Sequence, residues 1–557
     1  MVNQLLSRAP RCYFFSTPPP RPRSLSGEGR QRGDFAISII GRGDRLAARD
    51  RLFRLILLLL WTALSVYFTL GHVVWRDEMR ALSLALTGDS VTAMLRAIHG
   101  EGHPALWYLM LRGAHAVFPV REVLPVVGWL GAFAAACLFA WRAPFRPLVL
   151  ALILFGAFFA FEYAAIARNY AIGMLGLFAV AALYKSRRDR GVTIGVLLAL
   201  LCNTNVPCCV LAAAILGFWL VELLGEEGLR WGPKYRLFLL NAAVAAAGAA
   251  LCFATVFPTV HDAAVIDHPG GVGPVAVLKA LATPALSFWD LVPPFVPNSS
   301  VGAALFGILM FGSLLGLARA PAAFLSALGA MLAFELFFQL VYPGYYRHQA
   351  LYLCYLVAVY WLVAQGRGGR WPESWRIDAR VGRAQEVGEA LFVLLVALQV
   401  LTTMAMLSTV RAGYPYSRAR DLAALLQRER LDKAIVLADP DMFIEPLPYY
   451  LPEAPLYQMR AQRFGTVVRF TKQVRRELNP DDYLAEGRRL HAATGKPVVF
   501  VIQHRLRTDR PTRTKEINFW YFSTTPEQVR RFQAAVPRIA AFAPVVSDET
   551  YEVYALR

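Results

Sequence analysis

The sequence predicts a polytopic α-helical membrane protein that ends in a small α/β domain. Of its 557 residues, 56% are hydrophobic and only 17% are charged. The hydrophobic residues form runs of about fifteen to twenty that are separated by short polar breaks, as in membrane-spanning helices. From Pro415 onward this pattern stops, and strand-like and helix-like segments alternate. That alternation is typical of a layered α/β domain.

The strongly basic composition indicates membrane topology and not nucleic-acid binding. The formal net charge is +19. Most of the arginines lie in the N-terminal tail and in loops between apolar runs, as the positive-inside rule describes. The nearest expected partners are therefore anionic membrane lipids. The seven cysteines show no spacing typical of a metal site or a disulfide framework, so we expect them to pack in the interior.

Residues 1–50 are expected to form a disordered basic tail in the cytoplasm. The stretch 18–23 is rich in proline and arginine, and the stretch 27–33 is rich in glycine and charge. Such segments cannot bury enough apolar surface to fold alone. No short apolar stretch with a small-residue cleavage site precedes residue 51, so we do not expect a secretory signal.

The membrane domain is expected to cover residues 51–411 with about eleven spans. Basic loops at 185–190, 230–236 and 367–383 should be cytoplasmic. Counting from them places the first outer loop 75–103 and the outer loop 258–300 outside, together with everything after about residue 410. The candidate spans are 53–74, 104–118, 123–141, 147–162, 170–184, 192–206, 207–224, 237–257, 301–318, 321–341, 349–364 and 389–409.

One of these candidates, 104–118, is not expected to be an ordinary span. An inside N-terminus and an outside Asp77 leave one crossing too many before residue 185. The segment is short and carries Arg112 and His115. An arginine at the middle of the bilayer costs roughly 2.5–3.5 kcal/mol on insertion scales. We therefore expect this segment to be tilted, partial or re-entrant.

The C-terminal domain, residues 412–557, is expected to be extracytoplasmic. The predicted helices are 418–429, 482–494 and 525–535, and the second of them follows the start signal Asn479-Pro480-Asp481. The predicted strands are 434–438, 497–503 and an edge strand at 552–556. No glycine-rich phosphate loop is present. We expect Asp439-Pro440-Asp441 to form a turn and not a metal motif.

The first outer loop holds the most distinctive group of acid–base residues. Trp75-Arg76-Asp77-Glu78 follows the first apolar run, and Glu101-Gly102-His103-Pro104 opens the next apolar segment. Two carboxylates and an imidazole therefore lie just outside the hydrocarbon region, where burial and neighbouring charge can tune a proton acceptor. The alternative is an interfacial acidic pair that is solvated by headgroup water and paired with Arg76 or Arg80.

Two further clusters are expected on the same outer side. The first joins Glu162 to Arg168 and Tyr170, and the second is Tyr345-Tyr346-Arg347-His348. Guanidinium groups match phosphate oxygens with paired donors. Snorkelling arginines and an aromatic belt would give much of the same pattern.

The outer loop 258–300 offers a further phosphate or headgroup contact in Lys279. The same loop carries four potential metal ligands without the closing pair of a zinc site, so no metal is indicated. These four residues are His261, Asp262, His268 and Asp267.

Three motifs together resemble the GT-C glycosyltransferase superfamily. They are Trp-x-Asp-Glu in the first outer loop, then Gly-His-Pro-x-Leu-x-Tyr, then Ala-x-Ala-Arg-x-Tyr after paired spans. The closest pattern is that of the protein O-mannosyltransferase and aminoarabinose transferase group. The resemblance covers roughly residues 53–364. Relatives often carry a second acidic residue near Arg168-Asn169-Tyr170, and this chain has only Glu162 about two helical turns earlier.

The resemblance implies transfer of a sugar from a polyprenyl-phosphate donor on the extracytoplasmic face of a bacterial inner membrane. It makes Asp77 the general base, with Glu78 beside it, and places His103 in contact with the substrate. It also implies that Arg168 and Arg347 bind the donor phosphate. It implies no cofactor and leaves divalent metal open. The acceptor, whether lipid, glycan or protein, is not specified. A polyisoprenoid-lipid transporter or flippase and a membrane-anchored binding protein remain as alternatives.

Overall fold

The computed structural model of the protein describes residues 48–257, 273–282, 286–372, 381–517 and 519–557. The predicted tail up to residue 47 lies outside these ranges, and so do the four potential metal ligands of the outer loop.

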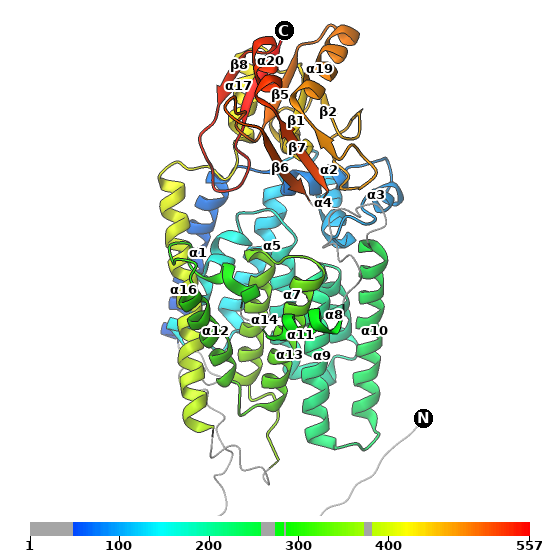
Figure 1. Ribbon diagram of the computed structural model, residues 1–557. Helices are drawn as coiled ribbons and strands as arrows, with labels where there is room; N and C mark the ends of the chain where they lie inside the picture. Colours follow the sequence, from blue (N-terminus) through cyan, green and yellow to red (C-terminus); the bar gives the residue numbers. More distant parts are fainter. Residues whose placement is uncertain (1–47, 258–272, 283–285, 373–380, 518) are drawn as a thin grey trace, which may run out of the picture. The chain divides into compact units, whose positions relative to one another are not determined.

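The described part of the chain between residues 48 and 411 is built from helices joined by loops. Their bounds are α1 (Ala48–Gly71), α2 (Arg76–Ala85), α3 (Val91–Ala97), α4 (Ala105–Val117), α5 (Val123–Arg142), α6 (Pro147–Leu154), η1 (Phe158–Glu162), α7 (Tyr170–Leu183), η2 (Tyr184–Asp189), α8 (Thr193–Cys202), α9 (Val206–Glu227), α10 (Pro233–Val256), α11 (Pro274–Ala282), η3 (Leu286–Leu291), α12 (Ser300–Leu315), α13 (Pro321–Leu340), α14 (Tyr346–Ala364) and α16 (Gly382–Arg411). Helix α16 packs beside α1, α6 and α12 (Figure 1).

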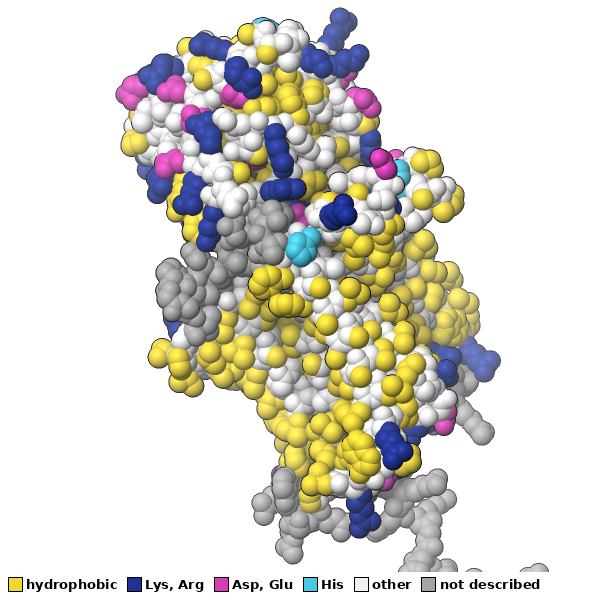
Figure 2. Space-filling model, turned by 90° about the vertical axis from the view of Figure 1, so that its right-hand side faces the viewer, with side chains coloured by type: hydrophobic (Ala, Val, Ile, Leu, Met, Phe, Trp, Pro, Cys, Tyr) yellow, Lys and Arg dark blue, Asp and Glu magenta, His cyan; other side chains and the backbone are white. Residues whose placement is uncertain are grey.

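The protein is an integral multi-pass membrane protein. Within the described residues, six helices are long and apolar enough to cross a membrane, namely α1, α5, α9, α10, α13 and α16. Helices α8 and α12 are apolar but shorter. On the face shown in Figure 2, hydrophobic side chains cover much of the helical part, whereas charged side chains gather towards its two ends. The predicted fold class is therefore confirmed, while the number of eleven spans stays a prediction.

Helix α4 occupies the segment that was expected not to be an ordinary span. Its 13 residues reach about 20 Å, which is less than the roughly 30 Å of a bilayer core. The Arg112 guanidinium donates to the carbonyl oxygens of Ala85 and Gly88, each at 2.9 Å. The charge that argued against a crossing is therefore bound to the backbone at the end of α2.

The predicted span 147–162 is not one helix. Helix α6 ends at Leu154, and a separate π-helical turn, η1, runs from Phe158 to Glu162. The break coincides with Gly156, where an added Cβ would lie 3.2 Å from the Cβ of Gln399 on α16. The chain between α6 and η1 therefore packs closely against α16 at this glycine, in place of a continuous helix.

The C-terminal part is a layered α/β structure. Its helices are α17 (Ala419–Arg428), η5 (Asp441–Ile444), α18 (Leu447–Tyr450), α19 (Pro480–Thr494) and α20 (Pro526–Ala535), and its strands are β1 (Ile435–Asp439), β2 (Leu456–Gln458), β3 (Arg463–Phe464), β4 (Glu477–Leu478), β5 (Val498–Ile502), β6 (Thr512–Ile517), β7 (Trp520–Thr524), β8 (Arg538–Ala541) and β9 (Glu552–Leu556). Asn479 caps α19 by accepting from the amides of Asp481 and Asp482, as the start signal predicted.

The main sheet has the order β3-β2-β1-β5-β9-β8, and β4-β7-β6 form a second sheet. Strand β1 is parallel to β2 and β5. Its residues contribute alternately to two apolar clusters, so both sheet faces are covered and the strand is apolar throughout. The prediction that 552–556 is an edge strand is wrong. Strand β8 pairs with the other side of β9, and its four residues, Arg-Ile-Ala-Ala, are too few to give a clear strand pattern.

Candidate active site at the start of helix α2

Asp77 and Glu78 lie in the first turn of α2, which begins directly after a short connection from α1. The amide of Trp75 donates to Oε2 of Glu78 at 3.1 Å, so Glu78 caps the helix. Carboxylates are favourable at this end of a helix because the first amides are unpaired. The side chain of Asp77 is 33% exposed, whereas that of Glu78 is fully buried. The two neighbouring carboxylates therefore have different surroundings.

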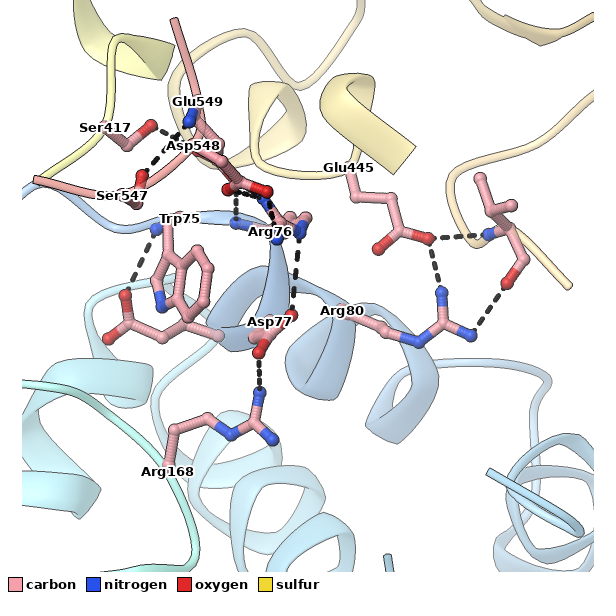
Figure 3. A network of polar contacts seen from close by, with 12 residues as sticks. Trp75, Arg76, Asp77, Arg80, Arg168, Ser417, Glu445, Ser547, Asp548 and Glu549 are labelled. Carbon is pink, nitrogen blue, oxygen red and sulfur yellow. Dashed lines mark hydrogen bonds and ion pairs between the residues drawn. The ribbon is translucent and has the colours of Figure 1, made fainter. Parts of the chain in front are cut away.

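Asp77 is paired with arginines from three different segments. Its Oδ2 lies 3.0 Å from Nη1 of Arg168, in the loop before α7, and 3.3 Å from Nη1 of Arg347 at the start of α14. Arg76 is 3.8 Å from Oδ1. Figure 3 shows Asp77 between Arg76 and Arg168. Burial alone would raise the pKa of Asp77, but attraction to the three arginines outweighs burial and lowers the pKa below its ordinary value. Asp77 is therefore ionised at neutral pH.

His103 joins this group through Arg168. Nη2 of Arg168 lies 2.9 Å from Nε2 of His103. Burial lowers the pKa of His103 to about 4, and the charge of Arg168 acts in the same direction. His103 is therefore neutral at pH 7 and accepts the hydrogen bond from Arg168 at Nε2. The positive charge at Asp77 comes from arginine and not from this imidazole.

Arg347 is fixed by several contacts besides Asp77. Its Nε lies 3.3 Å from Oε1 of Glu162, and its Nη2 donates to the hydroxyl of Tyr416 at 3.4 Å. The guanidinium carbon lies 5.0 Å from the centre of the Trp75 ring, a cation–π contact. Glu162 thus holds an arginine of the group and does not itself contact Asp77.

His348 and Tyr170 form the remaining polar pair of the group. The amide of Tyr345 donates to Nδ1 of His348 at 3.1 Å. In the neutral ring the proton is then on Nε2, which lies 2.9 Å from the hydroxyl oxygen of Tyr170 and donates to it. Seven predicted residues are therefore brought together, and we call them the arginine–carboxylate cluster: Asp77, His103, Glu162, Arg168, Tyr170, Arg347 and His348.

Glu78 faces away from this cluster and into the protein. Its Oε2 is 2.7 Å from Nε2 of His72, and its Oε1 accepts from the amide of Ala167 at 2.6 Å. Ala167 directly precedes Arg168. Glu78 therefore ties the start of α2 to the loop that carries Arg168, and its buried carboxylate has no exposed surface for a substrate.

Two other predicted residues lie elsewhere. The hydroxyl of Tyr346 donates to Oε1 of Gln399 at 2.8 Å, so its side chain points between α14 and α16. Lys279 is on α11, a helix that packs against α13. Within the described part of the chain, no group of three or more His, Cys, Asp or Glu residues could hold a metal ion.

No role was predicted for Tyr416, and for Arg76 and Arg80 the only role considered was pairing with the acidic pair. Arg76 and Arg80 flank the acidic pair with helical i, i+4 spacing, which was a visible signal. Their partners in the C-terminal part lie more than three hundred residues away and have no sequence signature, whereas Glu101, a further partner of Arg80, is only 21 residues away.

Comparisons with known proteins gave no family model and no similar curated protein. Among solved structures, the chain is similar to ArnT from Cupriavidus metallidurans. The apo crystal structure has 17% identity and a TM-score of 0.47, and covers 91% of this chain and 97% of ArnT. The crystal structure bound to undecaprenyl phosphate has 16% identity and a TM-score of 0.44, and covers 91% and 98%.

Proposed function

We propose that this protein is an integral-membrane glycosyltransferase that moves a sugar from a polyprenyl-phosphate donor to an acceptor on the extracytoplasmic face of the membrane. The observation that carries the proposal is the position of Asp77, a partly exposed and ionised carboxylate between the guanidiniums of Arg168 and Arg347. The sugar and polyprenyl assignments rest on the first-loop motifs that resemble GT-C enzymes.

The two arginines provide the site for the donor phosphate. Both side chains are largely buried and held in place, Arg168 by His103 and Arg347 by Glu162 and Tyr416. A fixed guanidinium pays little additional ordering entropy when it binds a phosphate and offers paired donors to its oxygens. The cluster lies at the ends of apolar helices, which suits a phosphate attached to a lipid tail.

Asp77 acts as the general base in this proposal. When the donor phosphate takes over the contacts of Arg168 and Arg347, the attraction that lowers the pKa of Asp77 weakens and the carboxylate becomes more basic. The acceptor hydroxyl then gives its proton to Asp77, and its oxygen bonds to the anomeric carbon. The bond from that carbon to the phosphate oxygen breaks, and the leaving polyprenyl phosphate is stabilised by the arginines.

Glu78 is a positioning residue in this scheme and not a second base. Its three hydrogen bonds hold the start of α2 against the loop that carries Arg168. A buried carboxylate with all of these partners cannot also receive a proton from an acceptor in solvent. The resemblance placed Glu78 beside the base, and the proposal keeps it there in a supporting role.

The direct test of the function is to identify the donor in cells. A strain lacking the protein should accumulate one polyprenyl-phosphate sugar, measured by mass spectrometry of the lipid extract, and lose one surface glycan modification. Reintroducing the wild-type gene should reverse both changes, whereas Asp77→Asn should not. Unchanged lipid-linked sugars and glycans in the deletion strain would contradict the proposal. Transport of an intact lipid headgroup without cleavage of its sugar would support the flippase alternative.

A further inference from the structure

Helix α2 is attached to the C-terminal part through Arg76. The two Nη atoms of Arg76 contact the two carboxylate oxygens of Asp548 at 2.5 and 3.0 Å. The backbone amide of Arg76 also donates to Oε1 of Glu549 at 3.0 Å. Oε2 of Glu549 accepts from the hydroxyl of Ser417, so this buried carboxylate is held from both sides (Figure 3).

Arg80, one turn later on α2, makes a second attachment. Its Nη1 donates to Oε1 of Glu445, and its Nη2 donates to the carbonyl oxygen of Val468 at 2.7 Å. The amide of Val468 in turn donates to the same Glu445 oxygen at 2.7 Å. Figure 3 shows Arg80 pointing towards Glu445.

The same guanidinium also fixes the loop that carries His103. Nε and Nη2 of Arg80 donate to the two oxygens of Glu101 at 2.9 and 2.8 Å, a bidentate pair. Glu101 precedes His103, which contacts Arg168. Arg80 therefore connects a C-terminal carboxylate with both the helix of Asp77 and the loop of His103.

These contacts determine where Asp77 lies. Residues i and i+4 share a helix face, so Arg76 and Arg80 point to the C-terminal part while Asp77 is turned towards Arg168 and Arg347. The first turn of α2 is thus held at both ends by residues after position 440. A catalytic group must keep its geometry to within about half an ångström, and such contacts are how neighbouring residues provide this.

We infer that Glu445 and Glu549 are positioning residues for the reaction at Asp77, so that the C-terminal α/β part is a working component of the transferase site. This inference rests on the proposed function. It assigns the C-terminal part a role that needs no substrate contact of its own. Losing either carboxylate should slow transfer while leaving the phosphate site formed by Arg168 and Arg347 in place.

The test uses the full-length protein with Glu445→Gln, and it separates binding from transfer. Burial raises the pKa of Glu445 and of Glu549 to about 7, so assays are run at pH 8, where both are ionised. Binding is measured with polyprenyl phosphate in phosphatidylcholine vesicles. Transfer is measured as consumption of the accumulated lipid-linked sugar in membranes of the deletion strain. We expect at least about a ten-fold slower transfer and less than a two-fold change in binding.

Three further variants make the outcome specific. Glu445→Asp, which keeps the charge, should recover part of the transfer rate. The double variant Arg80→Gln/Glu445→Gln should be no slower than Arg80→Gln alone, because the two residues act through one contact. Glu453→Gln, an exposed carboxylate of the same part, should match the wild type. If Glu445→Gln fails to fold, Ser417→Ala, which removes one contact of Glu549 and no charge, should still slow transfer several-fold.

The possible failures are distinguishable. Wild-type transfer in Glu445→Gln and Ser417→Ala, with Asp77→Asn inactive, would overturn this inference and leave the proposed function standing. Parallel loss of binding, transfer and melting temperature in Ser417→Ala would show a merely structural role and would also overturn it. Full transfer by Asp77→Asn would instead contradict the proposed function itself.

Discussion

Asp77 and Arg168 form an ion pair of 3.0 Å that joins the first helix after α1 to the loop before α7. Each residue is tied to a further member of the cluster: Asp77 contacts Arg347, and Arg168 contacts His103. The pair is therefore the centre of the arginine–carboxylate cluster. In the proposed reaction it is also the contact that the donor phosphate replaces.

Removing either guanidinium should weaken binding of the donor phosphate. A hydrogen bond to a charged group contributes about 1.5–3 kcal/mol, so Arg168→Gln and Arg347→Gln should each weaken binding of polyprenyl phosphate about ten- to a hundred-fold. Lysine at either position should be intermediate, because it keeps the charge but loses the forked geometry. Flotation with polyprenyl-phosphate vesicles measures this effect. Arg96→Gln, an exposed arginine on α3, is the matched control, and an equal loss in that variant would refute a specific site.

Replacing Glu78 by glutamine should destabilise the protein and reduce transfer without abolishing it. The amide nitrogen of glutamine cannot accept the hydrogen bonds that Glu78 takes from the amides of Trp75 and Ala167. One buried amide left without a partner costs about 1–3 kcal/mol, which should appear as a lower melting temperature in detergent. A stable Glu78→Gln protein that is as inactive as Asp77→Asn would show that Glu78 takes part in the chemistry.

The low pKa of His103 predicts a pH dependence of stability but not of transfer near pH 6.5. Because burial lowers this pKa to about 4, the unfolded chain binds more protons at His103 than the folded protein between about pH 4 and pH 6.5. Stability should therefore fall as the pH is lowered through this window, and His103→Gln should show a smaller fall. Melting temperatures at pH 5 and pH 7.5 measure it. If the transfer rate changed with a midpoint near pH 6.5 and His103→Gln removed that change, the result would contradict a neutral His103.

Much of the cluster could be predicted because its residues lie at the ends of apolar runs. Counting membrane crossings along the chain placed Asp77, Arg168 and Arg347 on one side of the membrane, and the structure brings their side chains into contact. Such a count does not tell which way a side chain turns at the end of its helix. Tyr346 therefore points towards Gln399, although its neighbours Arg347 and His348 join the cluster.

The contacts made by the C-terminal part could not be predicted from local patterns. Helices α17, α19 and α20 and strands β1, β5 and β9 followed from periodicity and capping, as at Asn479, whereas the paired strands β6 and β7 were not predicted. The ion pairs of Arg76 and Arg80 depend on how distant segments pack, which no single sequence window contains. Likewise, the split of Asp77 and Glu78 into a partly exposed and a buried carboxylate arises because Ala167 reaches Glu78 from another loop.

The most direct test of the central claim compares Asp77→Asn with the wild type in one experiment. Asparagine has nearly the same shape but cannot accept a proton at neutral pH. The account predicts that Asp77→Asn folds, binds polyprenyl phosphate at least as well as the wild type, because Arg168 and Arg347 lose a competing anion, and transfers sugar at least about a hundred-fold more slowly. Transfer at the wild-type rate by a properly folded Asp77→Asn protein would contradict it.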